Sequence, residues 1–288
     1  MPRVSYVNGA YVPHNQAAVH IEDRGYQFAD GVYEVIGVFN GNLVDNEDHL
    51  DRLDRSLREL EIAAPVHRSS LKFVLEETRR RNHVRDGKVY IQMTRGVAMR
   101  DHPFPVSPTG SLVVTASAVS WPSRENAKTG NSVITGPDIR WQRCDIKSVS
   151  LLPNLLAKQN AVTSEAAEMW MVNEEGFVTE GTASNAWIVT TDNEIITRQT
   201  DDKILAGITR NTVLKLIARE GLKVNLRPFT VEEAKAAKEA FFTSSTATVK
   251  PATKIDGASI GNGEVGEVTC QLIGAYYDHM AGNSNFND

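Results

Sequence analysis

The sequence contains little cysteine, with only Cys144 and Cys270 among its 288 residues. A chain of this length buries enough surface to fold without disulfides, so two distant cysteines indicate a reducing compartment rather than a disulfide framework. The sequence also lacks any apolar run near the roughly 20 residues that a membrane-spanning helix needs. Its first residues, "MPRVSYVNGA", lack the apolar segment of a signal peptide. We therefore expect a cytoplasmic protein that is not inserted in a membrane.

An excess of charge of one sign is missing as well. The 31 basic and 36 acidic residues give a net charge of -5, and the two signs alternate along the chain. A nucleic-acid-binding surface needs clustered positive charge to neutralise phosphates, so this pattern argues against DNA or RNA as a partner. Apolar residues, in contrast, make up 41% of the chain, which is enough for a substantial core in one large domain or two medium ones.

The hydrophobic pattern divides the chain into two parts. Extended runs rich in Val, Ile and Tyr predict strands at 3–12, 32–39, 88–95 and 110–119, and leucines three and four residues apart predict helices at 47–62 and 69–84. A polar stretch with Pro and Gly at 120–132 is the predicted linker. We expect an N-terminal domain at 1–119 and a C-terminal domain at 133–288, both mixing strands and helices, so the predicted fold class is α/β (α+β).

Three local signals predict helices in the second part. Pro153 suits a first helical position, because it has no backbone N–H to leave unpaired. A helix that begins at about residue 209 is expected to end near Gly221, which tolerates the left-handed conformation found after helix C-termini. Thr230 and Glu233 have the spacing of a capping box, which predicts a third helix start.

Two lysines in "RCDIKSVSLLPNLLAKQ" (143–159) are candidates for a chemical role. Lys158 flanks the predicted apolar stripe of the helix that starts at Pro153, which runs through positions 155, 159, 162 and 166, and such a lysine is typical of a solvated flank. Lys147 lies in a short extended segment, where position alone also favours a solvated side chain. An amine that condenses with a carbonyl needs a desolvated site and fixed charges that hold its partner. A chemical role for Lys147 therefore depends on other segments of the chain.

Seven segments, in order along the chain, carry a resemblance to a known family. They are "FADGVYEVIGVFNGN" (28–42), "HLDRLDRS" (49–56), "TRGVAMRDHPFP" (94–105), "CDIKSVSLLPNLLAKQNA" (144–161), "GFVTEGTASNAWIV" (176–189), "ILAGITRNTVL" (204–214) and "FFTSSTATVKPATKIDG" (241–257). Together they resemble the class IV, fold-type IV aminotransferases that use pyridoxal 5′-phosphate (PLP), and most closely the D-amino acid aminotransferases. The resemblance implies a two-domain fold with a small N-terminal α/β domain and a larger C-terminal pseudo-barrel domain that binds most of the cofactor.

The resemblance assigns the reactive end of the cofactor to Lys147 and its ring to Glu180. Lys147 matches the lysine that forms a Schiff base with the cofactor and then moves a proton between the substrate Cα and the cofactor C4′. Glu180, in "FVTEG", matches the carboxylate that pairs with the pyridine nitrogen. A fixed anion keeps that nitrogen protonated, so that the ring withdraws electrons. Without the surrounding segments, Glu180 is interpreted as a surface glutamate.

The implied phosphate site draws on three of these segments. Arg52 matches the phosphate arginine of the family, although the leucine periodicity of its helix predicts a solvated side chain. "GITR" opens a helix, so the backbone N–H groups of Ile208 and Thr209 are expected to face a dianion. Ser245 and Thr246, in "TSSTA", are expected to add hydroxyl donors. Taken alone, the two motifs are also typical of an ordinary helix start and a polar loop.

Tyr33, Arg100 and His102 match the residues that hold the substrate carboxylate in D-amino acid aminotransferases. An arginine grips a carboxylate with two hydrogen bonds, and Tyr and His add directed donors. The resemblance implies that the Cα–H of a D-amino acid then faces the lysine. In the family, the loop with this Arg and His reaches the neighbouring subunit's site, which implies a homodimer. From composition alone, "MRDHPFP" is interpreted as a polar loop bounded by prolines.

The implied activity is a ping-pong transfer of an amino group from a D-amino acid, of the D-alanine or D-glutamate type, to a 2-oxo acid, with PLP and without a metal. Four alternatives stay open: a branched-chain L-amino acid aminotransferase, an (R)-selective amine transaminase, aminodeoxychorismate lyase, and a protein that only binds the cofactor. An arginine grip opposes the amine transaminase, because a substrate without a carboxylate leaves a buried charge unpaired. Cys144 and Trp141 lie close to Lys147 in sequence and have no assigned role.

Overall fold

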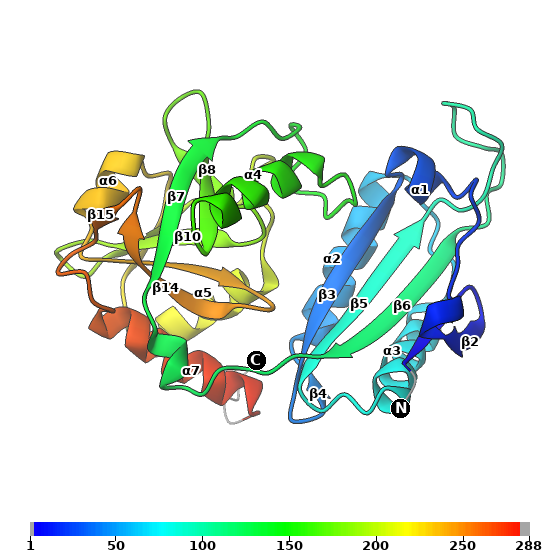
Figure 1. Cartoon of the computed structure of the whole chain (residues 1–288), viewed down its shortest axis with the longest axis horizontal. Helices are drawn as coiled ribbons and strands as arrows, with labels where there is room; N and C mark the ends of the chain where they lie inside the picture. The colour runs from blue at the N-terminus through cyan, green and yellow to red at the C-terminus, as the bar shows by residue number, and fades with distance from the viewer. Residues whose placement is uncertain (1–2, 283–288) are drawn as a thin grey trace. The chain divides into compact units, whose positions relative to one another are not determined.

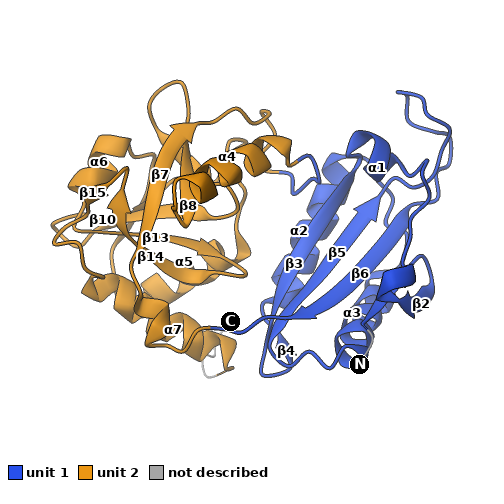
Figure 2. Cartoon of the chain, in the orientation of Figure 1, with its two compact units in different colours: residues 1–121, 146–150 blue, residues 122–145, 151–288 orange. Residues whose placement is uncertain are grey.

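The computed structural model describes residues 3–282 and divides into two compact units (Figure 2). Unit 1 comprises Met1–Trp121 and Ile146–Ser150, and unit 2 comprises Pro122–Asp145 and Leu151–Asp288. The domain bounds expected from the sequence stay a prediction. One segment departs from the order of the chain: residues 146–150, around Lys147, follow the predicted linker but belong to unit 1.

Unit 1 is an antiparallel sheet of six strands in the order β2-β1-β6-β5-β3-β4 (Figure 1). Its strands are β1 (Val4–Val7), β2 (Ala10–Pro13), β3 (Gly31–Phe39), β4 (Asn42–Leu43), β5 (Gly87–Thr94) and β6 (Ser111–Ala118). Its helices are η1 (His14–Gln16), α1 (Arg24–Phe28), α2 (Asn46–Glu59) and α3 (Arg68–Arg81). The single strand predicted at 3–12 is wrong, because Asn8 and Gly9 take φ values of 45° and 99° and turn the chain into a hairpin.

The apolar faces of α2 and α3 pack on this sheet. The leucine stripe predicted for α2 is confirmed, since Leu50, Leu53 and Leu57 are all buried and share one core with Ile36 of β3. Burying each such side chain contributes about 2 kcal/mol to folding. The stripe therefore fixes which face of α2 meets the sheet, and with it the direction of every other side chain on the helix.

The segment 146–150 extends this sheet alongside the start of β3. The Lys147 carbonyl accepts a hydrogen bond from the Tyr33 N–H at 3.0 Å, and the Val149 N–H donates to the Gly31 carbonyl at 3.0 Å. Backbone on both sides of Lys147 is thus fixed to β3, and the lysine side chain starts from a defined point.

Unit 2 is a mixed sheet of nine strands in the order β12-β11-β10-β13-β14-β7-β8-β9, with β15 paired to β14. Its strands are β7 (Asn131–Pro137), β8 (Glu168–Val172), β9 (Val178–Gly181), β10 (Asn185–Val189), β11 (Ile195–Thr197), β12 (Val224–Leu226), β13 (Glu239–Ser244), β14 (Thr248–Ile255) and β15 (Ala258–Ser259). Its helices are η2 (Asn126–Lys128), α4 (Leu152–Thr163), α5 (Ile208–Arg219), α6 (Val231–Ala236) and α7 (Glu267–Met280). Strands β9 and β10 are buried along their whole length, so polar groups on them lie inside the unit. The predicted α/β (α+β) class is confirmed.

The local helix signals in unit 2 are confirmed. Pro153 lies in the first turn of α4, and Gly221, just past the end of α5, has a left-handed φ of 67°. At α6 the Thr230 hydroxyl accepts from the Glu233 N–H at 3.1 Å, and the Glu233 carboxylate accepts from the Thr230 N–H at 3.0 Å. None of the helices within residues 3–282 has the length and apolar character that crossing a bilayer requires.

The apolar stripe predicted for α4 is wrong. Its buried face consists of Ala157 and Ala161, whose small side chains let the helix approach β8 closely. The larger apolar side chains of the helix lie on its outer face, where each is more than half exposed: Leu152, Leu155, Leu156 and Val162. Size, rather than hydrophobicity, decides which face packs inward here.

Candidate active site

Lys147 and Tyr33, which the resemblance assigns to one site, lie together in unit 1. The Lys147 N–H donates to the Ser56 hydroxyl at 3.2 Å, which adds a third backbone anchor to the two from β3. The Lys147 Nζ lies 4.3 Å from the centroid of the Tyr33 ring, a cation–π distance. The lysine side chain is half-buried and aligned along an aromatic face, which is the partly desolvated setting that an amine reagent needs.

Tyr90, which the sequence did not single out, stands beside Tyr33 on the neighbouring strand. The two rings are 5.8 Å apart, and the Tyr90 hydroxyl donates to the Gln92 side chain at 2.7 Å. Burial raises the pKa of Tyr90 to about 12, so its phenol stays neutral. Tyr90 therefore adds no negative charge beside Tyr33.

Arg52 is buried, and the solvated side chain expected from the periodicity of α2 is wrong. Its Nε and Nη2 donate to the two carboxylate oxygens of Glu34 at 2.8 and 2.9 Å, and His49 Nδ1 lies 2.7 Å from the same carboxylate. Burial alone would raise the pKa of Glu34, but the Arg52 guanidinium and the His49 ring lower it to about 2. Burial lowers the pKa of His49 despite the nearby carboxylate. An inward-facing Glu34 on β3 thus explains the burial of Arg52; the phosphate role of Arg52 stays a prediction.

Arg100 and His102 lie in the loop between β5 and β6, and both side chains are exposed. They meet on one aromatic ring, that of Phe28 at the end of α1. The Arg100 guanidinium carbon lies 4.9 Å from the ring centroid, and the His102 ring lies 5.9 Å from it in an edge-on arrangement. The structure therefore brings these two predicted carboxylate ligands together.

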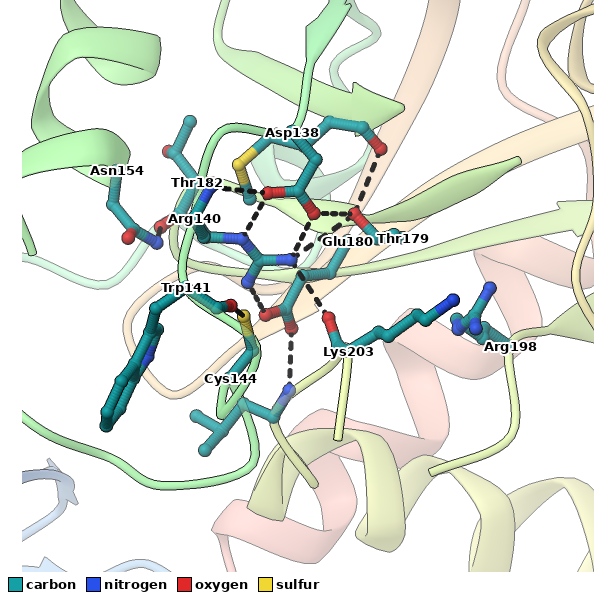
Figure 3. Close-up of polar contacts among 12 residues, drawn as sticks. Asp138, Arg140, Trp141, Cys144, Asn154, Thr179, Glu180, Thr182, Arg198 and Lys203 are labelled. Carbon is teal, nitrogen blue, oxygen red and sulfur yellow. Dashed lines mark hydrogen bonds and ion pairs between the residues drawn. The ribbon is translucent and has the colours of Figure 1, made fainter. Parts of the chain in front are cut away.

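Glu180 lies on β9 and is buried inside unit 2 (Figure 3). Its Oε1 accepts from Arg140 Nη1, and its Oε2 accepts from the Asn185 side-chain amide and the Leu205 N–H, both at 3.1 Å. Burial raises the pKa of this carboxyl above its ordinary value, and the opposing effect of Arg140 and the Leu205 N–H offsets this only in part. Three donors around two oxygens fit an ionised carboxylate in a defined orientation. The interpretation of Glu180 as a surface glutamate, which "TEG" alone suggests, is therefore wrong.

Arg140 is the main residue that the sequence analysis missed. It joins the half-buried carboxylate of Asp138 to the buried one of Glu180, donating from Nε and Nη2 to Asp138 at 2.9 and 2.7 Å and from Nη1 to Glu180. The Thr179 hydroxyl donates to Asp138 at 2.7 Å and completes the cluster (Figure 3). Burial would lower the pKa of Arg140, but Glu180 and Asp138 raise it above its ordinary value. No pattern in "GPDIRW" signals this role, because Glu180, the partner that connects Arg140 to the site, lies on β9, far away in sequence.

The start of α5 is connected to Glu180 through Asn185. Gly207 precedes the helix and has no side chain to cap it, so the N–H groups of Ile208 and Thr209 have no acceptor within the helix. A Cβ on Gly207 would lie 2.1 Å from Asn185 Oδ1, which is why only glycine fits. The Asn185 amide also donates to Glu180. The Asn185 side chain therefore both restricts position 207 to glycine and orients the Glu180 carboxylate.

Ser245 and Thr246 form the turn between β13 and β14. Ser245 is half-buried and Thr246 is exposed. The turn follows Ser244 at the end of β13, and the preceding residue, Thr243, lies opposite Asn185 in the pairing of β10 with β13. The predicted hydroxyl donors are therefore carried by the strand next to Asn185, and their role toward a phosphate stays a prediction.

Cys144 and Trp141, left unassigned by the sequence, form a short contact of their own. The Cys144 thiol donates to the Trp141 carbonyl at 3.0 Å, and burial raises the pKa of the thiol to about 12. A neutral, hydrogen-bonded thiol is not a nucleophile. Both cysteines are free, and residues 3–282 contain no group of three or more His, Cys, Asp or Glu suited to a metal ion.

Each unit by itself has groups that suit a phosphorylated pyridine aldehyde. In unit 2, a buried carboxylate held by three donors suits a protonated ring nitrogen, and an uncapped helix start suits a phosphate dianion. In unit 1, Lys147 is an amine of the kind that a carbonyl group requires.

Comparison with known proteins identifies the class. Residues 31–255 match the family model of amino-transferase class IV, and the chain belongs to this family. It is a transaminase that uses PLP, as predicted from the sequence. The chain is 42% identical over 262 residues to a D-alanine aminotransferase of Bacillus licheniformis, covering 91% of this chain and 92% of that one. It is 38% identical over 281 residues to a D-alanine aminotransferase of Staphylococcus haemolyticus, covering 97% and 99% of the two chains.

Solved structures of branched-chain amino acid aminotransferases share the fold. One from T.th., with pyridoxamine 5′-phosphate, has a TM-score of 0.90 at 26% identity and covers 99% of this chain and 96% of that one. Another, from Thermoproteus uzoniensis with norvaline, has a TM-score of 0.85 at 25% identity over 99% and 97% of the two chains. The predicted two-part, fold-type IV architecture is confirmed.

Proposed function

We propose that this transaminase acts on D-amino acids of the D-alanine and D-glutamate type and passes the amino group to a 2-oxo acid. The observation that carries this assignment is the pairing of Arg100 and His102 on the Phe28 ring, a cationic and a hydrogen-bonding group held side by side. Relatives named D-alanine aminotransferase, at 42% and 38% identity, support it.

In this function the three predicted carboxylate ligands fix the substrate. Arg100 binds the α-carboxylate through its planar fork, and His102 and Tyr33 add directed hydrogen bonds. A carboxylate fixed to one side leaves the Cα–H of the D enantiomer facing Lys147. An L-amino acid held by the same ligands turns its Cα–H away, which is the physical basis of the selectivity.

The chain's residues hold PLP by its charges. Glu180, oriented by Arg140 and Asn185, pairs with the ring nitrogen. Arg52 and the backbone N–H groups of Ile208 and Thr209 bind the phosphate. Ser245 and Thr246 add hydroxyl donors to the phosphate. When bound, PLP supplies a carbonyl that takes up the amino group and a ring that withdraws electrons. Lys147 Nζ acts as the general base that removes the proton from the substrate Cα.

The absorption spectrum of the purified holoenzyme tests the substrate class. Mixing it with single amino acids and no acceptor should convert the cofactor band with D-alanine and D-glutamate within one turnover. L-Valine and L-leucine should leave the band unchanged for the same time, because their Cα–H does not reach the lysine. Adding 2-oxoglutarate or pyruvate should then restore the original band.

Each alternative gives a different result in that experiment. Conversion by L-valine and not by D-alanine contradicts the assignment and indicates a branched-chain enzyme. Conversion by (R)-1-phenylethylamine alone indicates an amine transaminase. Pyruvate release from aminodeoxychorismate indicates the lyase, and a band that no amine changes indicates a protein that only binds the cofactor.

We also propose that the protein is a homodimer, as its family resemblance implies. The outer face of α4 supports this assembly, because its four large apolar side chains are each more than half exposed. Sedimentation should give the mass of two 31.7 kDa chains. The substitution Leu155→Glu should weaken the dimer about 100-fold, because it places a charge in an apolar contact. Phe73→Glu, on the exposed side of α3, is the matched control and should leave the dimer intact; a monomeric unsubstituted chain contradicts the proposal.

The two free cysteines support a reducing cytoplasmic location. Cell fractionation followed by immunodetection checks this, and recovery of the protein outside the cytoplasmic fraction contradicts it.

A further inference from the structure

Arg24 binds the backbone of the loop that carries Arg100 and His102. It is the first residue of α1 and is only 4% exposed. Its Nη1 donates to the carbonyls of Asp101 at 2.7 Å and Pro103 at 3.4 Å, and its Nη2 donates to the carbonyl of His102 at 3.3 Å. One guanidinium therefore holds three consecutive carbonyls of an irregular loop.

This arrangement needs an arginine. The guanidinium presents several N–H donors in a fixed plane, whereas a lysine ammonium is a point charge on a flexible stem. Carbonyls in a loop have no strand partner, so without Arg24 those at 101–103 depend on water. Replacing Arg24 is therefore expected to make the backbone at 101–103 less ordered.

A second arginine holds the next part of the same loop. Asp30 accepts from Arg24 Nε at 2.8 Å and also from Arg95, whose Nε and Nη2 donate to it at 2.8 and 3.1 Å. Arg95 in turn lies 3.6 Å from the ring centroid of Phe104. Asp30 is thus the shared anchor of two cations that hold neighbouring parts of the loop, and it keeps Arg95 as a partner if Arg24 is replaced.

Phe28 connects this anchor to the predicted carboxylate ligands. Arg24 and Phe28 are one helical turn apart on α1, and the Arg24 guanidinium lies 4.8 Å from the Phe28 ring centroid. Arg100 and His102 lie against the same ring at 4.9 and 5.9 Å. The residue that holds the loop backbone and the ring that gathers its functional side chains therefore belong to one short helix.

We propose that Arg24 is a positioning residue for binding of the substrate carboxylate, which it promotes by holding the 101–103 backbone so that Arg100 and His102 stay on the Phe28 ring. This inference rests on the proposed D-amino acid activity. Arg24 itself has its donors directed at Asp30 and the loop carbonyls. Ordering the loop in advance lowers the entropic cost of substrate binding, so its loss weakens binding before it slows the proton transfer at Lys147.

The test compares the holoenzyme with Arg24→Met and Arg24→Lys. Arg24→Met keeps the length of the side chain and removes all the donors, and Asp30 remains paired with Arg95. The KM for D-alanine should rise between about tenfold and 100-fold while kcat changes much less, since the effect is one of geometry at the carboxylate. Hydrogen exchange of amides at 97–104 should speed up about tenfold, and the cofactor band should be unchanged. Arg24→Lys should give a KM and an exchange rate between those of the unsubstituted enzyme and Arg24→Met. If Arg24→Met does not fold, Arg24→Lys provides the test.

Arg58→Met is the matched control, because Arg58 is exposed on α2 and its side chain forms no hydrogen bond or ion pair within residues 3–282. It should leave KM and loop exchange unchanged. A KM within about twofold of the unsubstituted enzyme in both Arg24 variants overturns the positioning role. So does a fall in kcat at unchanged KM. Failure of the proposed function looks different: the unsubstituted holoenzyme then does not react with D-alanine, whereas Arg24→Met still loosens the loop in hydrogen exchange.

Discussion

Replacing Lys147 with alanine is expected to lower kcat for D-amino acids by about 10⁴-fold, the upper range for loss of a general acid–base group. The same amine is proposed to carry the cofactor and to take the proton from the substrate Cα. The two aromatic residues beside it are poor substitutes: Tyr33 presents the face of its ring to the Lys147 Nζ, and Tyr90 has its pKa raised to about 12 by burial. Steady-state assays and the loss of the lysine-dependent cofactor band measure the effect.

Lys158→Ala is the control for this prediction, because Lys158 is the other lysine of the same stretch. Its Nζ donates to the Ala167 carbonyl at 2.6 Å and lies 3.7 Å from Glu168, so its partners are structural. Turnover of Lys158→Ala should stay within about twofold of the unsubstituted enzyme, as is usual for a half-exposed side chain away from the chemistry. Retained turnover in Lys147→Ala together with lost turnover in Lys158→Ala contradicts the assignment.

What the sequence predicted well were features set by local chemistry. The stripe on α2, the capping box at Thr230 and the helix start at Pro153 depend on residues within a few positions of each other, and all are present. The family class was also predictable, because seven motifs in register are independent observations of one pattern.

What the sequence did not predict were features set by contacts between distant segments. Arg52 lies off the leucine stripe and is buried only because Glu34, on β3, faces it. The leucines of α4 are exposed because the opposite face of the helix, with two alanines, packs against β8. Periodicity assumes that apolar residues face inward and charged ones outward. It fails where a buried charge has a partner or where a small side chain permits closer packing.

Arg140 illustrates the same limit at the site itself. One of its carboxylate partners, Asp138, is two residues away in sequence, whereas the other, Glu180, lies on β9. An isolated arginine after a strand has many uses, and its sequence context does not distinguish among them. The close fit of Gly207 against Asn185 was likewise invisible, because a glycine before a helix is common for reasons of backbone conformation alone.

Replacing Glu180 with glutamine is expected to lower kcat by about 100-fold or more, the range seen when one fixed electrostatic partner is removed from an active site. A neutral amide no longer holds a proton on the ring nitrogen, so the ring withdraws electrons less strongly. The change also affects folding. Glu180 accepts from Arg140 on one oxygen and from Asn185 and Leu205 on the other, and a glutamine NH₂ faces a donor whichever way it turns.

That mismatch should reduce the free energy of unfolding by about 1–3 kcal/mol. The loss is limited because Arg140 keeps its pair of hydrogen bonds to Asp138 and is not left as a lone buried charge. Urea unfolding of the holoenzyme gives the stability change, and kcat at saturating PLP gives the chemical one. Glu174→Gln is the control, since Glu174 is exposed in the turn between β8 and β9, and both quantities should be unchanged. If Glu180→Gln loses stability but keeps its kcat within about twofold, Glu180 is a structural carboxylate and its role toward the ring nitrogen is wrong.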